Sequence, residues 1–348
     1  MNVKPRIAAG IEDNLKFSFD KFFATYANSN LIPKHITRNA NILVILSINT
    51  TDIKFVFINN LFEMNMSTTN VREDWGRLCN HIFRFCAISV IAKKHKLHVN
   101  YHLSKYKSIR DLGIILYSSD TKKEGSRPNL IDETMLELYN SNEKIGGLTN
   151  YHNKFFQTKS CADLIFEYIR SDESKKSIID KNPYKDRYNN NNDCYVHVRL
   201  HDARKWNPGL SYYFQALDDL KFDKLYISSD QPGDSIVQEI KKRYDNSEIL
   251  KKSEIETIQF ASTCKNVVLS HGTFSGIIGY LSFYSNVYYC KVELNGWHPM
   301  GVFDGKDELT SCKPGKWIGI INSETKEKLD KIICDRRRAR EAAGNKYG

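Results

Sequence analysis

The sequence lacks the patterns that mark membrane-spanning and secreted proteins. Its 348 residues contain no run of about 18 apolar residues, so no segment is expected to cross a membrane. The first ten residues, Met1 to Gly10, contain no apolar stretch of the kind found in secretory signals. A cytoplasmic location is therefore expected.

Motifs of several well-known chemistries are also missing. Neither GxxxxGK[ST] nor GxGxxG occurs, so nothing supports a P-loop or a dinucleotide site. The eight cysteines form no Cys-x-x-Cys pair, and reduced, mostly buried thiols are expected. His95, His98 and His102 have a metal-like spacing, but they cross a boundary between a helix and a strand, and no carboxylate or cysteine joins them. No metal site and no cofactor are therefore predicted.

Positive charge is in excess, with a net charge of +10. Such a charge attracts anions, which include nucleic acid, acidic membranes and phosphorylated small molecules. The densest basic run, Arg336–Arg340, follows a helix-like segment at Glu324–Cys334. Its arginines could bind nucleic acid, or they could simply lie on a solvated face and favour the dipole at a helix end. The second interpretation is preferred, so nucleic acid is not an expected partner.

An asparagine-rich tract divides the chain into two parts of comparable size. Asn189–Asn192 lies within Lys181–Asp193, a polar segment that is interpreted as an exposed linker. At about 100–200 residues per domain, the length allows two domains. The expected divisions are an N-terminal arm (1–40), a first α/β domain (41–185), a Rossmann-like α/β domain (186–322) and a C-terminal helix with a basic tail (323–348).

The second part alternates between strand and helix patterns. Strands are expected at Cys194–Leu200, Lys224–Ser228, Asn266–Leu269 and Asn286–Cys290, and helices at Tyr212–Leu220, Ser235–Tyr244, Ile255–Thr263 and Thr273–Phe283. This alternation predicts βαβ units, and hence a parallel sheet covered on both faces.

The first part is less regular. Asn41–Ile48 and Ile53–Ile58 are expected to be strands, and the turn between them could make a hairpin. A helix is expected from His81 to about Lys96, and further strands at His98–Tyr101 and Leu112–Leu116. The prediction is a second, looser α/β domain.

Polar residues follow three of the predicted strands in the second part. Ligands of open parallel sheets bind beyond the carboxyl ends of the strands. Arg199, and with it His197, would lie at that edge, where a guanidinium fork matches the oxygens of a phosphate. The alternative is a surface arginine in a loop. Asp230, after the next strand, could accept hydrogen bonds from a ribose or a base, or it could merely start a helix.

The third polar segment, Ser270–Gly276, stands between a strand and an apolar helix. Its glycine allows a tight turn, and the free N–H groups of the helix start would form an anion site aligned with the helix dipole. Ordinary capping by Ser or Thr is the alternative. The position at the sheet edge favours an anion site.

Together these segments resemble the fucosyltransferase-like glycosyltransferases, namely the α1,2-fucosyltransferases and the protein O-fucosyltransferases, in order and spacing over about residues 70–290. The family's Gly-x-x-Gly-Asn loop is matched by Gly76, Arg77, Leu78, Cys79 and Asn80, its His-x-Arg-Arg-x-Asp motif by His197, Arg199 and Asp202, its Tyr-Tyr helix by Tyr212 and Tyr213, its Ser-Asp strand end by Ser229 and Asp230, and its Ser-x-x-Thr/Ser-Phe-Ser segment by Ser270–Ser275.

The resemblance implies a GT-B fold, in which two Rossmann-like domains with parallel sheets face each other across a cleft. The first domain would hold the acceptor and the second the nucleotide sugar. It also implies inverting, metal-independent transfer, and the sequence accordingly has no Asp-x-Asp. By this resemblance Arg199 binds the diphosphate and Asn80 faces the reacting centre. The donor would be held by His197, Arg199, Asp230, Ser270, Gly272, Thr273, Phe274 and Ser275, and Gly76, Arg77 and His81 would lie on the acceptor side.

Two departures leave the donor open. Cys79 stands at the second loop glycine, and Leu200 stands at the second arginine. GDP-fucose is the family's usual donor, but UDP-xylose or another GDP- or UDP-linked sugar would fit the same logic. The expected partners are this nucleotide-sugar co-substrate and a glycan or glycoprotein acceptor. The lysine- and asparagine-rich composition would suit a bacterial or viral cytoplasmic member, the latter in the host cytoplasm.

Other functions stay open. Glu73, Asp74, His81 and Asp202 are the candidates for a general base, with Asp74 and Asp202 counted beside Arg199 and Asn80 as catalytic candidates. A basic protein that binds nucleic acid without turnover is one alternative. A carbohydrate-binding or scaffold protein with a decayed transferase fold is another, and the two departures keep it open.

Overall fold

The computed structural model describes residues 44–45, 56–57, 67–72, 76–102, 104–149, 151, 155–291 and 316–344. Residues 66–348 form one compact unit, and residues 1–65 form another. In the latter, β1 (Val44–Ile45) and β2 (Val56–Phe57) pair antiparallel, which confirms the predicted hairpin for these four residues. Below, residues 67–182 are called the first half of the larger unit and residues 194–344 its second half.

The second half is built on a sheet of six parallel strands in the order β10-β9-β8-β5-β6-β7. These strands are β5 (Cys194–Val198), β6 (Leu225–Ser229), β7 (Ser247–Ile249), β8 (Asn266–Val268), β9 (Asn286–Cys290) and β10 (Trp317–Ile320). The four predicted strands and their parallel arrangement are confirmed. The two edge strands, β7 and β10, were not predicted because each is short and lacks a long apolar run.

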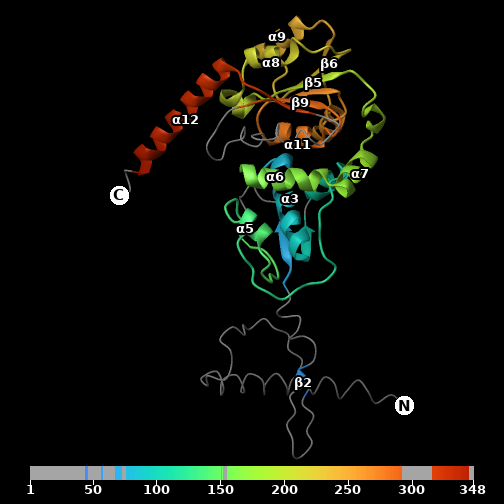
Figure 1. The fold of residues 1–348 in the computed structure, drawn as a ribbon, viewed down its shortest axis with the longest axis vertical. Coiled ribbons are helices and arrows are strands. Elements are labelled where there is room, and N and C mark those ends of the chain that lie inside the picture. The colour runs from blue at the N-terminus through green and yellow to red at the C-terminus, as the bar shows by residue number, and fades with distance from the viewer. Residues whose placement is uncertain are drawn as a thin grey trace, which may run out of the picture. The chain divides into compact units, whose positions relative to one another are not determined.

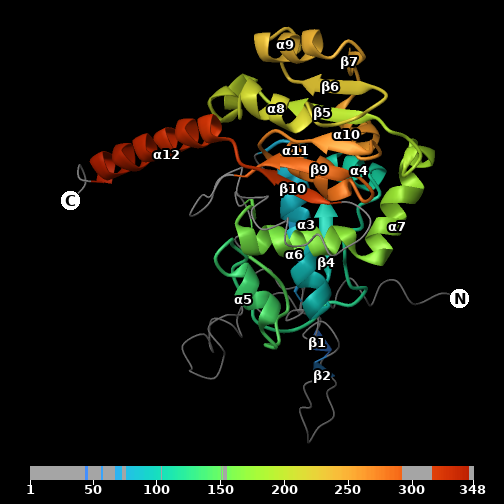
Figure 2. The ribbon, with the colours of Figure 1, turned by 45° about the horizontal axis from the view of Figure 1, so that its top comes forward.

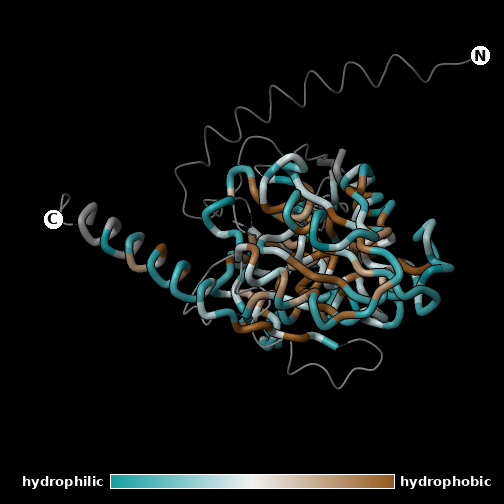
Figure 3. The backbone as a smooth tube through the Cα atoms, turned by 90° about the horizontal axis from the view of Figure 1, so that it is seen from above, coloured by the Kyte–Doolittle hydropathy of each residue, from teal (hydrophilic) through white to brown (hydrophobic). Residues whose placement is uncertain are grey.

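The helices between these strands cover both faces of the sheet (Figures 1 and 2). They are α8 (Leu210–Leu217), α9 (Ser235–Arg243), α10 (Glu254–Ala261) and α11 (Thr273–Leu281), each at a predicted position. The strands supply apolar side chains to both faces in alternation: Val196 and Val268 pack with α8 and α9, whereas Tyr195 and Val267 pack with α10 and α11. Figure 3 shows the hydrophobic segments concentrated inside and the hydrophilic ones outside.

The first half contains a smaller parallel pair, β3 (Thr69–Arg72) with β4 (Val99–His102). Its helices are α3 (Leu78–His95), α4 (Ser104–Asp111), α5 (Met135–Asn140), α6 (Lys159–Arg170) and α7 (Asp172–Lys181). The predicted helix after the glycine loop and the strand after it are confirmed. The strand predicted at Leu112–Leu116 is wrong: these residues form a turn and an irregular segment, in which Leu112 and Ile114 are buried without a neighbouring strand.

Helix α3 carries most of the core of the first half. Fourteen of its residues are buried, from Leu78 to Ala92, so it is enclosed on nearly all sides. It ends at Lys96, which adopts a left-handed conformation with φ of 54°. Basic residues in its last turn favour the negative end of the helix dipole.

The two halves share one hydrophobic core. Helix α11 packs against α3 and α6, and the Phe83 and Tyr280 rings lie 5.6 Å apart at this junction. Arg170 of α6 donates hydrogen bonds to the backbone oxygens of Tyr280 and Phe283 at 3.1 and 3.3 Å. The α/β class with parallel sheets is therefore confirmed, and the halves are joined by direct packing.

The segment Lys181–Asp193, predicted to be an exposed linker, is partly exposed but has an ordered structure of its own. It contains a short 3-10 helix, η1 (Lys185–Arg187), and Asn182 is buried. The Asn182 amide donates to the Gln259 backbone oxygen at 2.9 Å, and Arg187 pairs with Asp193 at 2.7 Å. Asparagine side chains here satisfy backbone groups, which composition alone does not reveal.

The final described helix, α12 (Ser323–Gly344), includes the predicted helix and the basic run. It packs on α8 near its start, where Thr325 and Leu329 are buried, and then extends away from the sheet (Figure 1). No helix among the described residues is long and apolar enough to cross a membrane. The described cysteines are all free thiols, and six of the seven are buried, as predicted.

Candidate functional site

A pocket of about 510 Å³ lies where the two halves meet at the carboxyl edge of the large sheet. Its volume is within the usual range of ligand sites, about 300–1,000 Å³. The first half lines it with Gly76, Arg77, Leu78, Cys79, Asn80, Phe155 and Gln157, and the second half with Arg199, Asp202, Ala203, Lys205, Trp206, Glu254, His271, Gly272, Thr273 and Phe274. Most of the predicted site residues are thus brought together.

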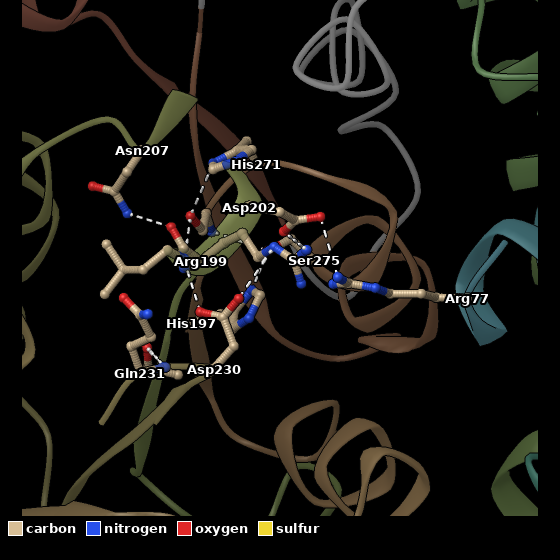
Figure 4. Close-up of polar contacts among 12 residues, drawn as sticks. Arg77, His197, Arg199, Asp202, Asn207, Asp230, Gln231, His271 and Ser275 are labelled. Atoms are coloured by element: carbon tan, nitrogen blue, oxygen red, sulfur yellow. Dashed lines mark hydrogen bonds and ion pairs between the residues drawn. The ribbon is translucent and has the colours of Figure 1, made fainter. Parts of the chain in front are cut away.

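Arg199 follows the last residue of β5 and is held at both its backbone and its guanidinium. Its backbone N–H donates to Ser270 Oγ at 3.2 Å, and its carbonyl accepts from the Asn207 amide at 2.9 Å. Its guanidinium donates to Asp202 at 2.5 Å and lies 3.4 Å from an oxygen of Asp230 (Figure 4). With only 18% of its side chain exposed, the cation is fixed before any ligand arrives.

Asp202 bridges the two halves. One carboxylate oxygen accepts from Arg199, and the other accepts from Arg77 at 3.1 Å (Figure 4). Partial burial opposes ionisation of this carboxyl, but the two guanidiniums outweigh it and hold its pKa below the ordinary value. Asp202 lies in the first turn of a 3-10 helix, η2 (His201–Trp206), and half of its side chain is exposed. Asp202 is thus an accessible carboxylate that lies between two guanidinium cations.

His197 lies beneath the pocket and supports it. Its Nδ1 is 2.6 Å from Ser275 Oγ, and its ring lies 5.1 Å from that of Phe274. Burial, and then the nearby Arg199 charge, lower the pKa of His197 to about 3. The imidazole is therefore neutral at pH 7 and fixes the start of α11 instead of contacting a ligand.

The start of α11 presents backbone N–H groups to the pocket. Gly272 precedes the helix with φ of 91°, a conformation that favours glycine, and a Cβ added there would meet no atom within 4 Å. No side chain of the described residues caps this helix. Ser270 and Ser275, both buried, bond to each other through Ser270 N–H and Ser275 Oγ at 3.1 Å. Gly272–Phe274 therefore form the pocket wall here, with the two serines behind it.

Asp230 has a different place from the one predicted. One of its oxygens accepts from the Leu200 N–H at 2.8 Å, and the other faces the Arg199 guanidinium. It does not line the pocket. It orients Arg199, so an interpretation as a direct contact to ribose or base has no support from its position.

The first half closes the pocket through Asn80. Its Oδ1 accepts hydrogen bonds from Thr273 Oγ1 at 2.8 Å and from Gln157 Nε2 at 3.3 Å. Among the described residues its Nδ2 has no partner, so this amide can donate to a ligand. Gly76, with φ of 127°, packs against the Asn80 side chain. The predicted glycine loop is therefore at the pocket, joined to the start of α11.

One predicted base candidate, His81, is poorly placed, and two lie outside the described residues. His81 is buried in the core, where its Nε2 lies 3.1 Å from the Gly76 backbone oxygen and its ring packs near Phe85. It cannot reach a ligand, because its side chain has no exposed surface. Glu73 and Asp74 are not among the described residues.

Several pocket residues were not predicted. Phe155, Gln157 and Glu254 come from segments that carry no motif, and only the fold brings them to the pocket. Lys205 and Trp206 follow the arginine motif directly, so their closeness to Arg199 was the one usable signal. Among the described residues no group of three His, Cys, Asp or Glu side chains could hold a metal ion.

Comparison of the sequence with protein-family models and with curated proteins gives no match. Comparison with solved structures gives similar folds at low identity. The fucosyltransferase NodZ from Bradyrhizobium is 11% identical over 64% of this chain and 94% of that chain, with a TM-score of 0.41. The E. coli heptosyltransferase WaaC with an ADP-linked fluoro heptose is 8% identical over 67% and 91%, with a TM-score of 0.36. POFUT1 in complex with GDP is 10% identical over 65% and 98%, with a TM-score of 0.33.

Proposed function

We propose that the protein is a glycosyltransferase that moves a sugar from a nucleotide-sugar donor to an acceptor hydroxyl. One observation carries the proposal: Arg199 and the start of α11 line the same pocket. A buried guanidinium fork and the N-terminus of a helix are both suited to phosphate oxygens. Their convergence at the carboxyl edge of a parallel sheet favours a diphosphate there.

This arrangement fits the charge that develops during sugar transfer. When the bond between the sugar and the nucleotide breaks, negative charge grows on the departing diphosphate. Donors that are already fixed stabilise that charge more than they stabilise the bound donor, which accelerates the reaction. Arg199 meets this requirement, since Asp230 and two backbone hydrogen bonds hold it in place.

Asp202 occupies the position in which we expect the diphosphate to bind. Its carboxylate lies between the Arg199 and Arg77 guanidiniums and is half exposed. A diphosphate offers the same acceptor oxygens with more charge, so it would replace Asp202 between the two cations. Arg77, predicted on the acceptor side, would then help to hold the donor from the opposite wall.

The finer assignment follows the resemblance of the motifs. We propose inverting transfer without a metal, in a GT-B arrangement, with the acceptor glycan or glycoprotein held by the first half. Fucose from GDP-fucose is the primary candidate, and UDP-xylose is the alternative. Asn80 would face the reacting centre with its Nδ2 amide group.

A panel of nucleotides tests the proposal. We expect GDP or UDP to stabilise the protein against heat, because a ligand at 100 times its Kd adds about 2.7 kcal/mol to the free energy of unfolding. The matching sugar nucleotide should also release free nucleotide when candidate acceptor glycans are added. Stabilisation without release would indicate a binding protein. Stabilisation by oligonucleotides alone, lost steeply as salt rises, would indicate a nucleic-acid-binding protein and contradict the proposal.

A further inference from the structure

Among the described residues, two carboxylates line the pocket, and their surroundings differ. Asp202 is bound by two guanidiniums, and these lower its pKa, so it is a weak proton acceptor. Glu254, at the start of α10, makes no ion pair and no side-chain hydrogen bond with any described residue. Pairs of carboxylates in contrasting environments commonly divide their roles in catalysis.

The backbone around Glu254 is rigid, and its side chain is not needed for that rigidity. Ser253 caps α10 through a reciprocal pair of hydrogen bonds: its hydroxyl accepts from the Glu256 N–H at 3.3 Å, and the Glu256 carboxylate accepts from the Ser253 N–H at 3.1 Å. The Glu256 side chain is therefore part of the helix cap. The exposed Glu254 carboxylate is left at the pocket wall on a fixed helix start.

Glu254 lies near the start of α3, on the side where the acceptor is proposed to bind. The Cys79 thiol, buried there, has a pKa raised first by burial and then by the negative charge of Glu254, while Arg199 lowers it. Cys79, Arg199 and Glu254 all line the pocket. This places a carboxylate and the diphosphate-binding cation around one region of the pocket.

The other ionisable groups that line the pocket in the described part of the chain are not suited to accept a proton. Arg77, Arg199 and Lys205 are cations, the Cys79 thiol is kept neutral by burial, and only 1% of His271 is exposed. Lys252, two residues before Glu254, is also a cation. Its ammonium group lies over the Tyr184 and Phe260 rings, at 5.1 and 5.6 Å from their centroids.

We propose that Glu254 is the general base of the transfer reaction, a role that rests on the proposed function. The acceptor hydroxyl gives its proton to the Glu254 carboxylate while its oxygen forms a bond with the anomeric carbon. The bond between that carbon and the diphosphate oxygen breaks, and its electron pair leaves with the nucleoside diphosphate toward Arg199. No other reactant is required.

The Glu254→Gln variant tests this role, because the amide keeps the shape but cannot accept the proton. We expect kcat for transfer to fall by about 10²–10⁴, the usual contribution of a general base. KM for the donor and thermal stabilisation by the nucleotide should stay unchanged. We expect kcat of the wild type to fall toward acid pH, and this fall should disappear in the variant. Glu239→Gln, an exposed change on α9, is the matched control and should behave like the wild type.

The outcomes separate the two proposals. If the wild type transfers sugar and Glu254→Gln keeps its kcat and its pH profile, Glu254 is not the base. If the variant binds the donor more weakly and keeps kcat, Glu254 contacts the donor, which also overturns this assignment. If the wild type neither binds a nucleotide nor transfers a sugar, the proposed function itself is wrong.

Discussion

The two walls of the pocket differ in how firmly they are built. On the second-half wall, Arg199 is largely buried and held by its backbone and by two carboxylates, with the neutral His197 packed below. On the first-half wall, the Arg77 side chain is 57% exposed, and among the described residues its one partner is Asp202. The difference teaches that the Arg199 cation is held in place on one side, whereas the Arg77 cation on the other side is free to move.

One fixed wall and one adaptable wall would suit the proposed reaction, in which the diphosphate of the donor is constant and the acceptor varies. A diphosphate always presents the same oxygens, so fixed donors serve it well. Acceptors vary in shape, and an exposed side chain such as Arg77 can adjust to them at little energetic cost. The comparison can be tested by changing one wall at a time.

The largest difference is expected between Arg199→Ala and Arg77→Ala. Removing the fixed donor should lower kcat for transfer by about 10²–10³, as loss of one preorganised donor does. Removing the exposed one should lower kcat/KM by less than about tenfold, because exposed charges are screened by solvent. Steady-state kinetics with one donor and one acceptor give both values.

Arg199→Lys sharpens this result. Lysine keeps the charge but loses the planar fork, so it should recover only part of the activity. Equal effects of the Ala changes at both arginines would show that the walls do not differ in the way described.

The next effect concerns stability in acid. His197 has a pKa of about 3 in the folded protein, whereas an unfolded histidine titrates near 6.5. The unfolded state therefore binds more protons between these values, and the free energy of unfolding falls as the pH drops through this window. We expect this group to remove about 2 kcal/mol between pH 7 and pH 5, at about 1.4 kcal/mol per pH unit. Urea denaturation at both pH values measures it.

His197→Gln should flatten this dependence, whatever its own stability, because the titrating group is gone. His201→Gln changes an exposed histidine nearby and should leave the slope as in the wild type. If the wild-type stability does not change from pH 7 to pH 5, the buried, neutral state of His197 would be wrong.

The smallest effect should come from the hydrogen bond that joins the walls. Thr273→Val and Asn80→Ala, combined in a double-mutant cycle, should show a coupling of about 0.5–1.5 kcal/mol in the free energy of unfolding. Gln157→Leu with Asn80→Ala should couple more weakly, since that contact is 3.3 Å against 2.8 Å. Zero coupling for Thr273 would mean that the walls are not joined at this point.

Local patterns were sufficient for most elements of the second half. Its apolar strands alternate with amphipathic helices, and that alternation depends only on residues close in sequence. The edge strands β7 and β10 were not predicted, because their pairing depends on neighbours far along the chain. The strand predicted at Leu112–Leu116 was wrong for a related reason: Leu112 and Ile114 are buried in the core, but in the described structure this segment is not part of a strand.

Part of the site could be predicted in the same way, from local patterns. Arg199 and Gly272 each follow a strand of a parallel sheet, and the sheet brings such positions to one edge whatever the details. His81 and Asp230 were assigned correctly to their segments, yet the direction of a side chain depends on packing. His81 turned into the core, and Asp230 turned toward Arg199.

By itself the sequence determined that a parallel α/β sheet would form and that a cation and a glycine-started helix would meet at its edge, because strand and helix periodicity and chain direction dictate both. Only the tertiary structure decided which side chains face the ligand. It buried His81, tied Asp202 between two arginines and brought Glu254 to the pocket wall. Burial and charge pairing arise from contacts between residues distant in sequence, and those contacts exist only once the chain has folded.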